Sequence, residues 1–103
     1  MNAQETLAAI DSLTAETRAM LLTLWKAAMP NGGDFGFSTE AFWLWKKDNP
    51  EGSAQKFAGH YGALTSKFLL YSDDEVEVNG KRLGESCYSF PEEVSSYLWS
   101  LEG

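Results

Sequence analysis

The hydrophobic pattern of this chain changes its period within one short stretch, and that change restricts the fold more than any other feature. Between residues 54 and 68, apolar side chains recur at the 3.6-residue spacing of a helix. They are Ala54, Phe57, Ala58, Tyr61, Leu64 and Phe68. Ser53 stands just before them and belongs to the residue types preferred at an N-cap. The sequence therefore predicts a helix over about residues 54–68.

Residues 76–83 have the two-residue period of a strand around a central Asn79-Gly80 pair. Asn-Gly fits the two positive-φ positions of a type I′ turn, so this segment predicts a tight β-hairpin. The returning strand is expected to continue through residues 87–90. The predicted register pairs Val78 with Lys81, Glu77 with Arg82 and Val76 with Leu83.

Four more helices are predicted from apolar spacing and from residues that begin or end helices. They cover residues 2–10, residues 15–29 with Thr14 as the N-cap, residues 39–47 with Ser38 as the N-cap, and residues 91–103 with Pro91 at the start. The side chains expected to be buried are Leu7 and Ile10 in the first of these, Leu21, Leu24, Trp25, Ala28 and Met29 in the second, Ala41, Phe42, Leu44 and Trp45 in the third, and Val94, Leu98 and Leu101 in the last.

Three helices, a hairpin and a final helix, in this order, resemble the winged helix-turn-helix superfamily of bacterial and phage regulators. The stretch that carries the resemblance is SAQKFAGHYGALTSKFLLYSDDEVEVNGKRL, from Ser53 to Leu83. The resemblance spans residues 14–90 and implies one α+β domain over residues 1–103, with 1–13 as an N-terminal extension and 91–103 as a C-terminal helix. The chain departs from the family pattern after the recognition helix, where Phe68-Leu69 replaces the usual glycine.

Composition limits the class of protein. A chain of 103 residues has room for one modest core, and its 14% aromatic content favours a packed fold over disorder. No apolar run approaches the roughly 18 residues of a membrane span, and the first ten residues lack the basic cluster of a signal peptide. The single cysteine, Cys87, cannot form an internal disulfide. We therefore expect a cytoplasmic protein that does not bind membranes.

Basic residues are concentrated in the middle of an acidic chain. The net charge is −7, yet six of the eight basic residues lie between positions 46 and 82. Lys56, His60, Ala63 and Lys67 recur at helical spacing opposite the apolar stripe of the 54–68 helix. Basic ends that flank small residues suit a helix that enters the major groove of duplex DNA. The predicted DNA-binding residues are Lys46, Lys47, Gln55, Lys56, His60, Lys67, Lys81 and Arg82, and the alternative is that they form an ordinary solvated face.

Two tryptophans fall outside the apolar stripes of their helices. Trp43 lies with polar residues on the 39–47 helix, and Trp99 lies off the stripe of the last helix. Exposed tryptophans contribute strongly to protein interfaces, so both are predicted partner-binding residues. The alternative is that Trp43 packs beneath the glycine-rich loop 31–37 and Trp99 against the N-terminal segment.

Catalytic patterns are scarce. His60 is the single histidine, and its spacing suggests no pair with Cys87. The acidic stretch at residues 73–77 does not have the spacing of an EF-hand, and no phosphate-binding glycine loop occurs. We therefore expect no enzymatic activity, no cofactor and no metal site.

Two functions remain. The first is a DNA-binding regulatory or accessory protein that forms a homodimer through its terminal helices, because one monomer offers few phosphate contacts. The second is an acidic winged-helix module that binds or inhibits a nucleic-acid-binding host protein. In size and charge the chain is similar to small phage-encoded inhibitors, which is an analogy of type alone.

Overall fold

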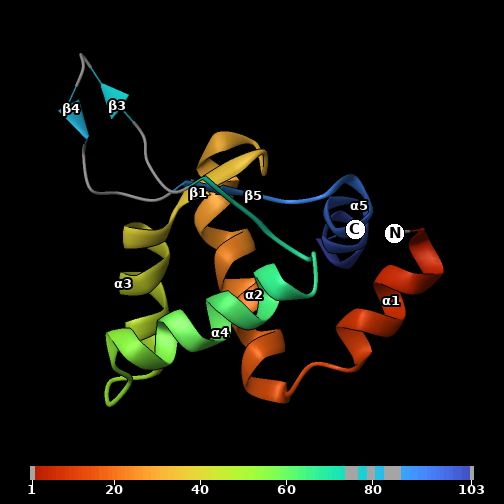
Figure 1. Cartoon of the computed structure of the whole chain (residues 1–103), viewed down its shortest axis with the longest axis horizontal. Coiled ribbons are helices and arrows are strands. Elements are labelled where there is room, and N and C mark those ends of the chain that lie inside the picture. Colours follow the sequence, from red (N-terminus) through yellow and green to blue (C-terminus); the bar gives the residue numbers. More distant parts are fainter. Residues whose placement is uncertain (1, 74–76, 79–80, 83–86, 103) are drawn as a thin grey trace.

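The chain folds into helices and a small antiparallel sheet (Figure 1). The structure is a computed structural model that describes residues 2–73, 77–78, 81–82 and 87–102. In this part of the chain the α-helices are α1 (Ala3–Asp11), α2 (Ala15–Ala28), α3 (Ser38–Asp48), α4 (Ala54–Ser66) and α5 (Glu92–Glu102), with a short 3₁₀ helix at Met29–Asn31. The strands are β1 (Phe35–Phe37), β2 (Tyr71–Asp73), β3 (Glu77–Val78), β4 (Lys81–Arg82) and β5 (Cys87–Ser89). The predicted α+β class is confirmed.

The main sheet has the strand order β1-β5-β2, with both pairs antiparallel. At its centre Tyr88 lies between Gly36 and Ser72. Strand β1 differs from the prediction, which places residues 31–37 in a loop. A three-residue strand gains its hydrogen bonds from β5, far away in sequence, and has no room for a detectable alternation.

The β3–β4 hairpin has the register that the sequence predicts. Glu77 faces Arg82, and Val78 faces Lys81. The predicted pair of Val76 with Leu83 and the Asn79-Gly80 turn lie outside the described residues.

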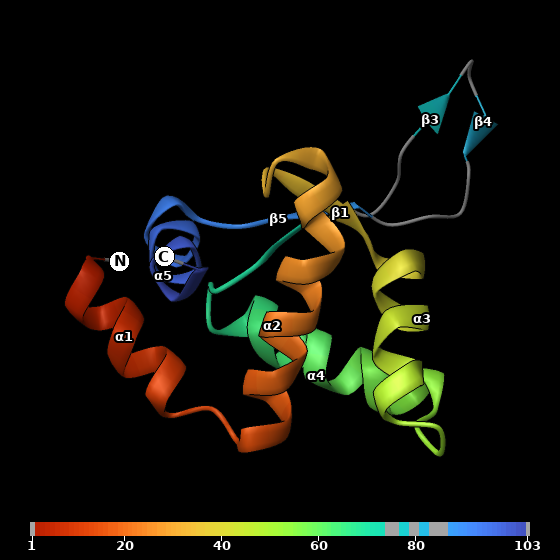
Figure 2. The same ribbon diagram turned by 180° about the vertical axis from the view of Figure 1, so that it is seen from behind.

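Helix α2 is the centre of the fold. The Thr14 hydroxyl accepts a hydrogen bond from the Thr17 amide, so the predicted N-cap is confirmed. Figure 2 shows α2 between the α1–α5 pair on one side and α3 on the other. The helix contacts α3, α4 and β1, and four residues of the predicted stripe are buried, namely Leu21, Leu24, Trp25 and Ala28. The fifth, Met29, lies in the 3₁₀ helix after α2 and is only partly buried.

Helix α3 begins differently from the prediction. Ser38 is its first residue rather than its N-cap, and the N-cap position belongs to Phe37. The reason is that β1 leads directly into the helix, so the last extended residue is the last residue of the strand. On the inner side Ala41 and Trp45 are buried, while Phe42 and Leu44 are partly buried.

Helix α4 begins at its predicted cap, Ser53, and ends at Ser66, two residues before the predicted end. Phe68 then adopts φ of 59°, in the left-handed region. Its amide donates to the Thr65 carbonyl at 3.1 Å, and the Leu69 amide donates to the Leu64 carbonyl at 3.0 Å. These two bonds are those of a Schellman motif, and both leucines are buried beneath it. Phe68 therefore occupies the glycine position of the motif and is 70% exposed, so its predicted burial is wrong.

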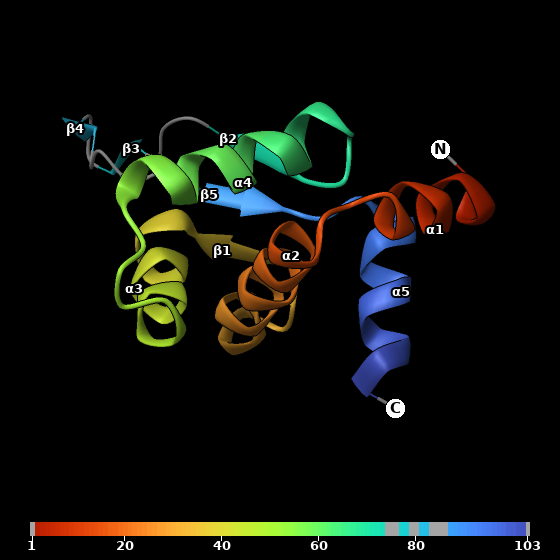
Figure 3. The ribbon, with the colours of Figure 1, turned by 90° about the horizontal axis from the view of Figure 1, so that it is seen from below.

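The terminal helices α1 and α5 pack on each other at one end of the molecule (Figure 3). Thr6 and Ile10 are buried in this contact. Leu7 is exposed, so of the two predicted apolar residues of α1 only Ile10 belongs to the core. In α5, Val94 and Leu98 are buried as predicted, but Leu101 is exposed. Figure 3 shows α1 beside the first turns of α5, so the last turn of α5 extends beyond that contact.

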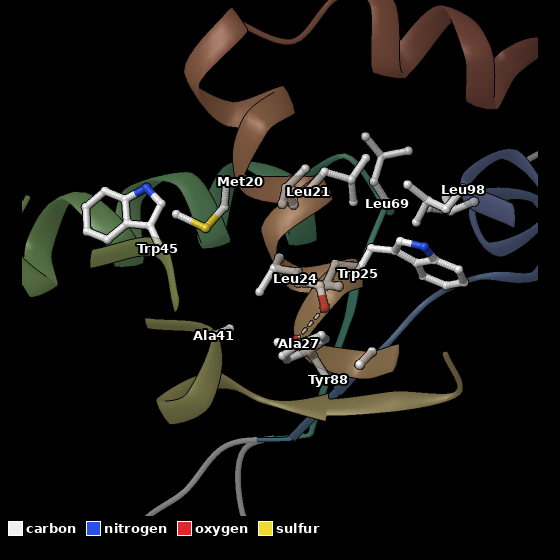
Figure 4. Packing of buried hydrophobic residues seen from close by; sticks show 14 of the residues in the cluster. Met20, Leu21, Leu24, Trp25, Ala27, Ala41, Trp45, Leu69, Tyr88 and Leu98 are labelled. Carbon is white, nitrogen blue, oxygen red and sulfur yellow. Dashed lines mark hydrogen bonds between the residues drawn. The ribbon is translucent and has the colours of Figure 1, made fainter. Parts of the chain in front are cut away.

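A buried tyrosine joins the sheet to α2 (Figure 4). The Tyr88 hydroxyl donates to the Leu24 carbonyl at 2.6 Å. Burial raises the pKa of Tyr88 well above its ordinary value of 10.0, so the hydroxyl stays protonated as a donor. Gly36 makes this contact possible, because an added Cβ at Gly36 would overlap the Tyr88 hydroxyl.

Candidate functional site

The predicted DNA-binding face of α4 is turned partly toward the rest of the protein. Lys56 and Lys67 are exposed, as expected, whereas His60 and Ala63 are partly buried. His60 Nδ1 lies 2.9 Å from Thr17 Oγ1 of α2, and Lys67 Nζ lies 3.3 Å from Ser12 Oγ before α2. The expectation that these four side chains share one outward face is therefore only partly right. The physical reason is that α4 crosses α2 on this side.

His60 ends a chain of hydroxyl contacts that ties α4 to the start of α2. The Thr14 hydroxyl donates to Thr17 Oγ1 at 3.0 Å while Thr14 Oγ1 accepts from the Thr17 amide at 3.2 Å. Thr17 Oγ1 in turn shares a hydrogen bond with Nδ1 of His60 at 2.9 Å. In this arrangement His60 is a packing residue of the helix–helix contact.

The truly open side of α4 is almost uncharged. Its exposed residues are Gln55, Ala58, Gly59, Gly62 and Ser66, with Lys56 at one edge. A Cβ added at Gly59 or Gly62 would meet no described atom within 4 Å. Another molecule could approach the helix backbone here, but Gln55 alone offers an amide for base recognition.

The two lysines at the end of α3 have different environments. Lys46 Nζ donates to the Pro50 carbonyl at 2.9 Å and to the Gly52 carbonyl, so its ammonium group holds the turn between α3 and α4. Lys47 is exposed. Lys81 and Arg82 form β4, and their side chains lie outside the described part of the chain. Lys46 is therefore less available to a phosphate than the sequence suggested.

An open groove of ≈ 930 Å³ lies between the start of α2 and the α3–α4 turn. Lys56 and His60 line it together with Glu16 and Glu51, and Trp45 contributes to its wall. Two carboxylates beside two basic side chains oppose the accumulation of positive charge that phosphate binding requires. The groove has no net basic character.

Trp43 projects from the outer side of α3, as predicted, and is 61% exposed. This exposure is incompatible with the alternative that it packs beneath loop 31–37. The Trp43 ring is nevertheless supported, because it lies edge-on to Phe42 with a centroid distance of 5.2 Å. Phe42 in turn packs edge-on to Phe57 of α4 at 5.4 Å.

Trp99 is 45% exposed and rests on the core. Its ring lies perpendicular to Trp25 at 5.0 Å, and an added Cβ at Gly33 would lie 3.2 Å from it. The ring therefore packs against α2 and the loop that follows.

Ring contacts connect these two surface tryptophans through the core. Successive centroids are 5.0 to 6.2 Å apart. The order is Trp43, Phe42, Phe57, Tyr61, Tyr88, Phe90, Trp25 and Trp99. Both exposed rings thereby rest on neighbouring rings, and an aromatic side chain that is already held in place binds a partner with little loss of conformational entropy.

Three further exposed aromatics were not predicted, and Phe35 of β1 is the least exposed of them, at 38%. Phe68 is 70% exposed and Tyr71, the first residue of β2, is 57% exposed. One sequence signal pointed to the exposure of Phe68, namely the absence of the usual glycine after α4. A residue that takes the place of this glycine lies beyond the end of the helix, so the helical period does not predict whether its side chain is buried.

Other chemistry finds no support among the described residues. They contain no group of three or more His, Cys, Asp or Glu side chains that could hold a metal ion. None of the helices in the described ranges is long and apolar enough to cross a membrane. Cys87 lies in β5, where it pairs with Phe37 of β1 and Asp73 of β2.

Comparison of the chain with protein-family models, with curated protein sequences and with solved structures found no significant match. The assignment of a function therefore depends on the chain's own residues.

Proposed function

We propose that this chain is a non-enzymatic, winged-helix-like module that binds another protein through the outer side of α3, with Trp43 as the central contact. The observation that carries the proposal is the 61% exposure of a tryptophan that the core holds edge-on through Phe42. Buried interface tryptophans contribute more binding free energy than most other residues. A ring that is already fixed loses little freedom when a partner covers it.

The order of elements supports the winged-helix part of the proposal. Helix α2, strand β1, helices α3 and α4, strand β2, the β3–β4 hairpin and strand β5 follow one another along the chain. The sheet order β1-β5-β2 is compatible with that arrangement. In it, α4 takes the place of the recognition helix and the β3–β4 hairpin takes the place of the wing.

Charge indicates the chemistry of the partner. Glu40 and Lys47 are exposed beside Trp43 on the outer side of α3, so the contact has a polar rim around an aromatic centre. The whole chain carries a net charge of −7, which favours a partner with a basic surface. Proteins that bind nucleic acids commonly present such a surface.

The proposal is tested by affinity capture with immobilised wild-type protein, in lysate treated with nuclease. We expect a captured protein that Trp43→Ala loses and that Tyr71→Ala retains, because Tyr71 is an aromatic of similar exposure on another element. Circular dichroism confirms that both variants fold. Equal capture by the wild type and Trp43→Ala would contradict the proposal.

A second candidate is direct DNA binding through α4. It is favoured by the open side of α4, where Gly59 and Gly62 would let a groove of DNA approach and where Lys56 and Lys67 lie toward the two ends. Here Lys56 and Lys67 would contact phosphates, and Lys81 and Arg82 of the hairpin would contact the flanking backbone. Fluorescence anisotropy with random duplex DNA at low salt tests this candidate. We would expect salt-sensitive binding that a Lys56→Ala/Lys67→Ala variant loses, and an absence of binding would exclude it.

A further inference from the structure

A second surface with the features of a docking site lies at the opposite end of the molecule from α3. It is a groove of ≈ 480 Å³ between the terminal helices. Its walls include Ala3 and Leu7 from α1 and Glu93, Ser96 and Tyr97 from α5. Figures 1 and 2 show α1 and α5 side by side, separated from α3 by α2.

Exposed apolar side chains lie in this groove and next to it. Leu7 is 45% exposed on the α1 wall. Leu101 does not line the groove, but it is 55% exposed and lies one helical turn beyond Tyr97 on α5, so exposed apolar surface continues along that helix beside the groove. A stripe of this kind on a pair of helices matches the requirement for a third helix, whose side chains at positions i, i+3, i+4 and i+7 would pack on it.

The charge of the two helices is of one sign. Residues 3–11 and 92–102 contain no lysine, arginine or histidine. They contain five carboxylates, namely Glu5, Asp11, Glu92, Glu93 and Glu102. Glu92 and Glu93 line the groove itself, at the first turn of α5. An occupant that carries positive charge beside its apolar residues is therefore complementary to this surface.

We propose that the α1–α5 groove binds an amphipathic, basic α-helix of another protein. The inference rests on the proposed function only in that the partner is a protein, and it uses a surface separate from Trp43. A second copy of this chain fits less well, because its α1 and α5 would bring further carboxylates against Glu92 and Glu93. Apolar contact through Leu7 and Leu101 would give affinity, and the carboxylates would set the sign of the partner's charge.

The test uses a fluorescein-labelled peptide of about 18 leucine and lysine residues at helical spacing, which is about 27 Å long when helical. Its binding to the full chain is followed by fluorescence anisotropy. Leu7→Ser should weaken binding about fivefold, whereas Leu22→Ser, an exposed leucine on α2, should not. Glu92→Gln/Glu93→Gln should weaken binding about fivefold at low salt, whereas Glu16→Gln/Glu51→Gln, with the same change in net charge, should not.

The location of the peptide is checked by NMR, as changes in the backbone amide chemical shifts of Ala3, Ser96 and Ser100, which line the groove. A peptide of the same composition without helical spacing should not bind. Equal losses in the two double variants, or shifts confined to α3, would overturn the inference. Self-association that Leu7→Ser abolishes would identify a second copy as the occupant and would also overturn it. Trp43→Ala should leave peptide binding unchanged, so the failure of the groove and the failure of the Trp43 proposal give different results.

Discussion

The left-handed conformation of Phe68 leads to a prediction with an unusual sign. At an ordinary helical position alanine is more stable than glycine by about 1 kcal/mol. Phe68 has φ of 59° at the end of α4, where only glycine avoids a clash of Cβ with the backbone. We therefore expect Phe68→Gly to be more stable than Phe68→Ala.

The magnitude follows from three contributions. The left-handed conformation costs an L residue about 1–2 kcal/mol. Phe68→Gly avoids this cost, but its unfolded chain has more conformational freedom, which lowers the free energy of unfolding by about 0.4–1 kcal/mol relative to Phe68→Ala. With central values of about 1.5 and about 0.7 kcal/mol for these two effects, the difference between the two variants is about 0.8 kcal/mol in favour of glycine. Because Phe68 is 70% exposed, removal of its ring costs both variants the same small amount, about 0.5–0.9 kcal/mol.

Urea unfolding followed by circular dichroism measures this difference from the midpoints at a common m-value. Ala58, which is exposed within α4, supplies the control, since Ala58→Gly should lower stability by about 1 kcal/mol. A Phe68→Ala variant as stable as Phe68→Gly would refute the left-handed conformation.

Three further predictions concern the contacts around α2. Tyr88→Phe removes the donor to the Leu24 carbonyl and should lower the free energy of unfolding by about 1 kcal/mol, measured by urea unfolding. The pKa of Tyr88 is higher in the folded than in the unfolded protein, so its contribution to the free energy of unfolding is complete below the unfolded pKa and is lost as the pH rises toward the folded pKa. The free energy of unfolding of the wild type should therefore fall more steeply above about pH 10 than that of Tyr88→Phe. Gly36→Ala places a Cβ against the Tyr88 hydroxyl and should lower stability by about 1–3 kcal/mol; a thermal midpoint equal to that of the wild type would contradict this close approach. Thr17→Val removes the hydrogen bond between Thr17 Oγ1 and Nδ1 of His60 and should destabilise the fold by about 1 kcal/mol. Adding His60→Ala should then cause no further loss, if the two residues act as one contact in a double-mutant cycle.

Local signals in the sequence predict much of this fold. Thr14 and Ser53 are N-caps in the structure, and the register of Glu77 with Arg82 follows from a two-residue turn. Such features depend on side chains a few residues apart, so a single sequence contains them. Strand β1 depends on pairing with β5, fifty or more residues later, and no local pattern could reveal it.

The candidate site was less predictable, because it depends on how the helices cross. The open side of α4 and its buried side both contain small residues, so the helical period did not show that His60 turns toward Thr17. Lys46 reaches carbonyl groups of the following turn, a contact that a long flexible side chain makes only in the folded chain. Trp43 was predictable because a large aromatic on the polar side of a short helix leaves few places to bury it.

Photo-crosslinking from position 43 tests the central proposal most directly. Benzoylphenylalanine placed at Trp43 is irradiated in lysate from the cells in which the protein occurs, with and without nuclease. Our account predicts a protein adduct that persists after nuclease treatment and that is absent when the same group replaces Tyr71. An adduct formed equally from both positions, or one that nuclease removes, would contradict protein binding through the outer side of α3.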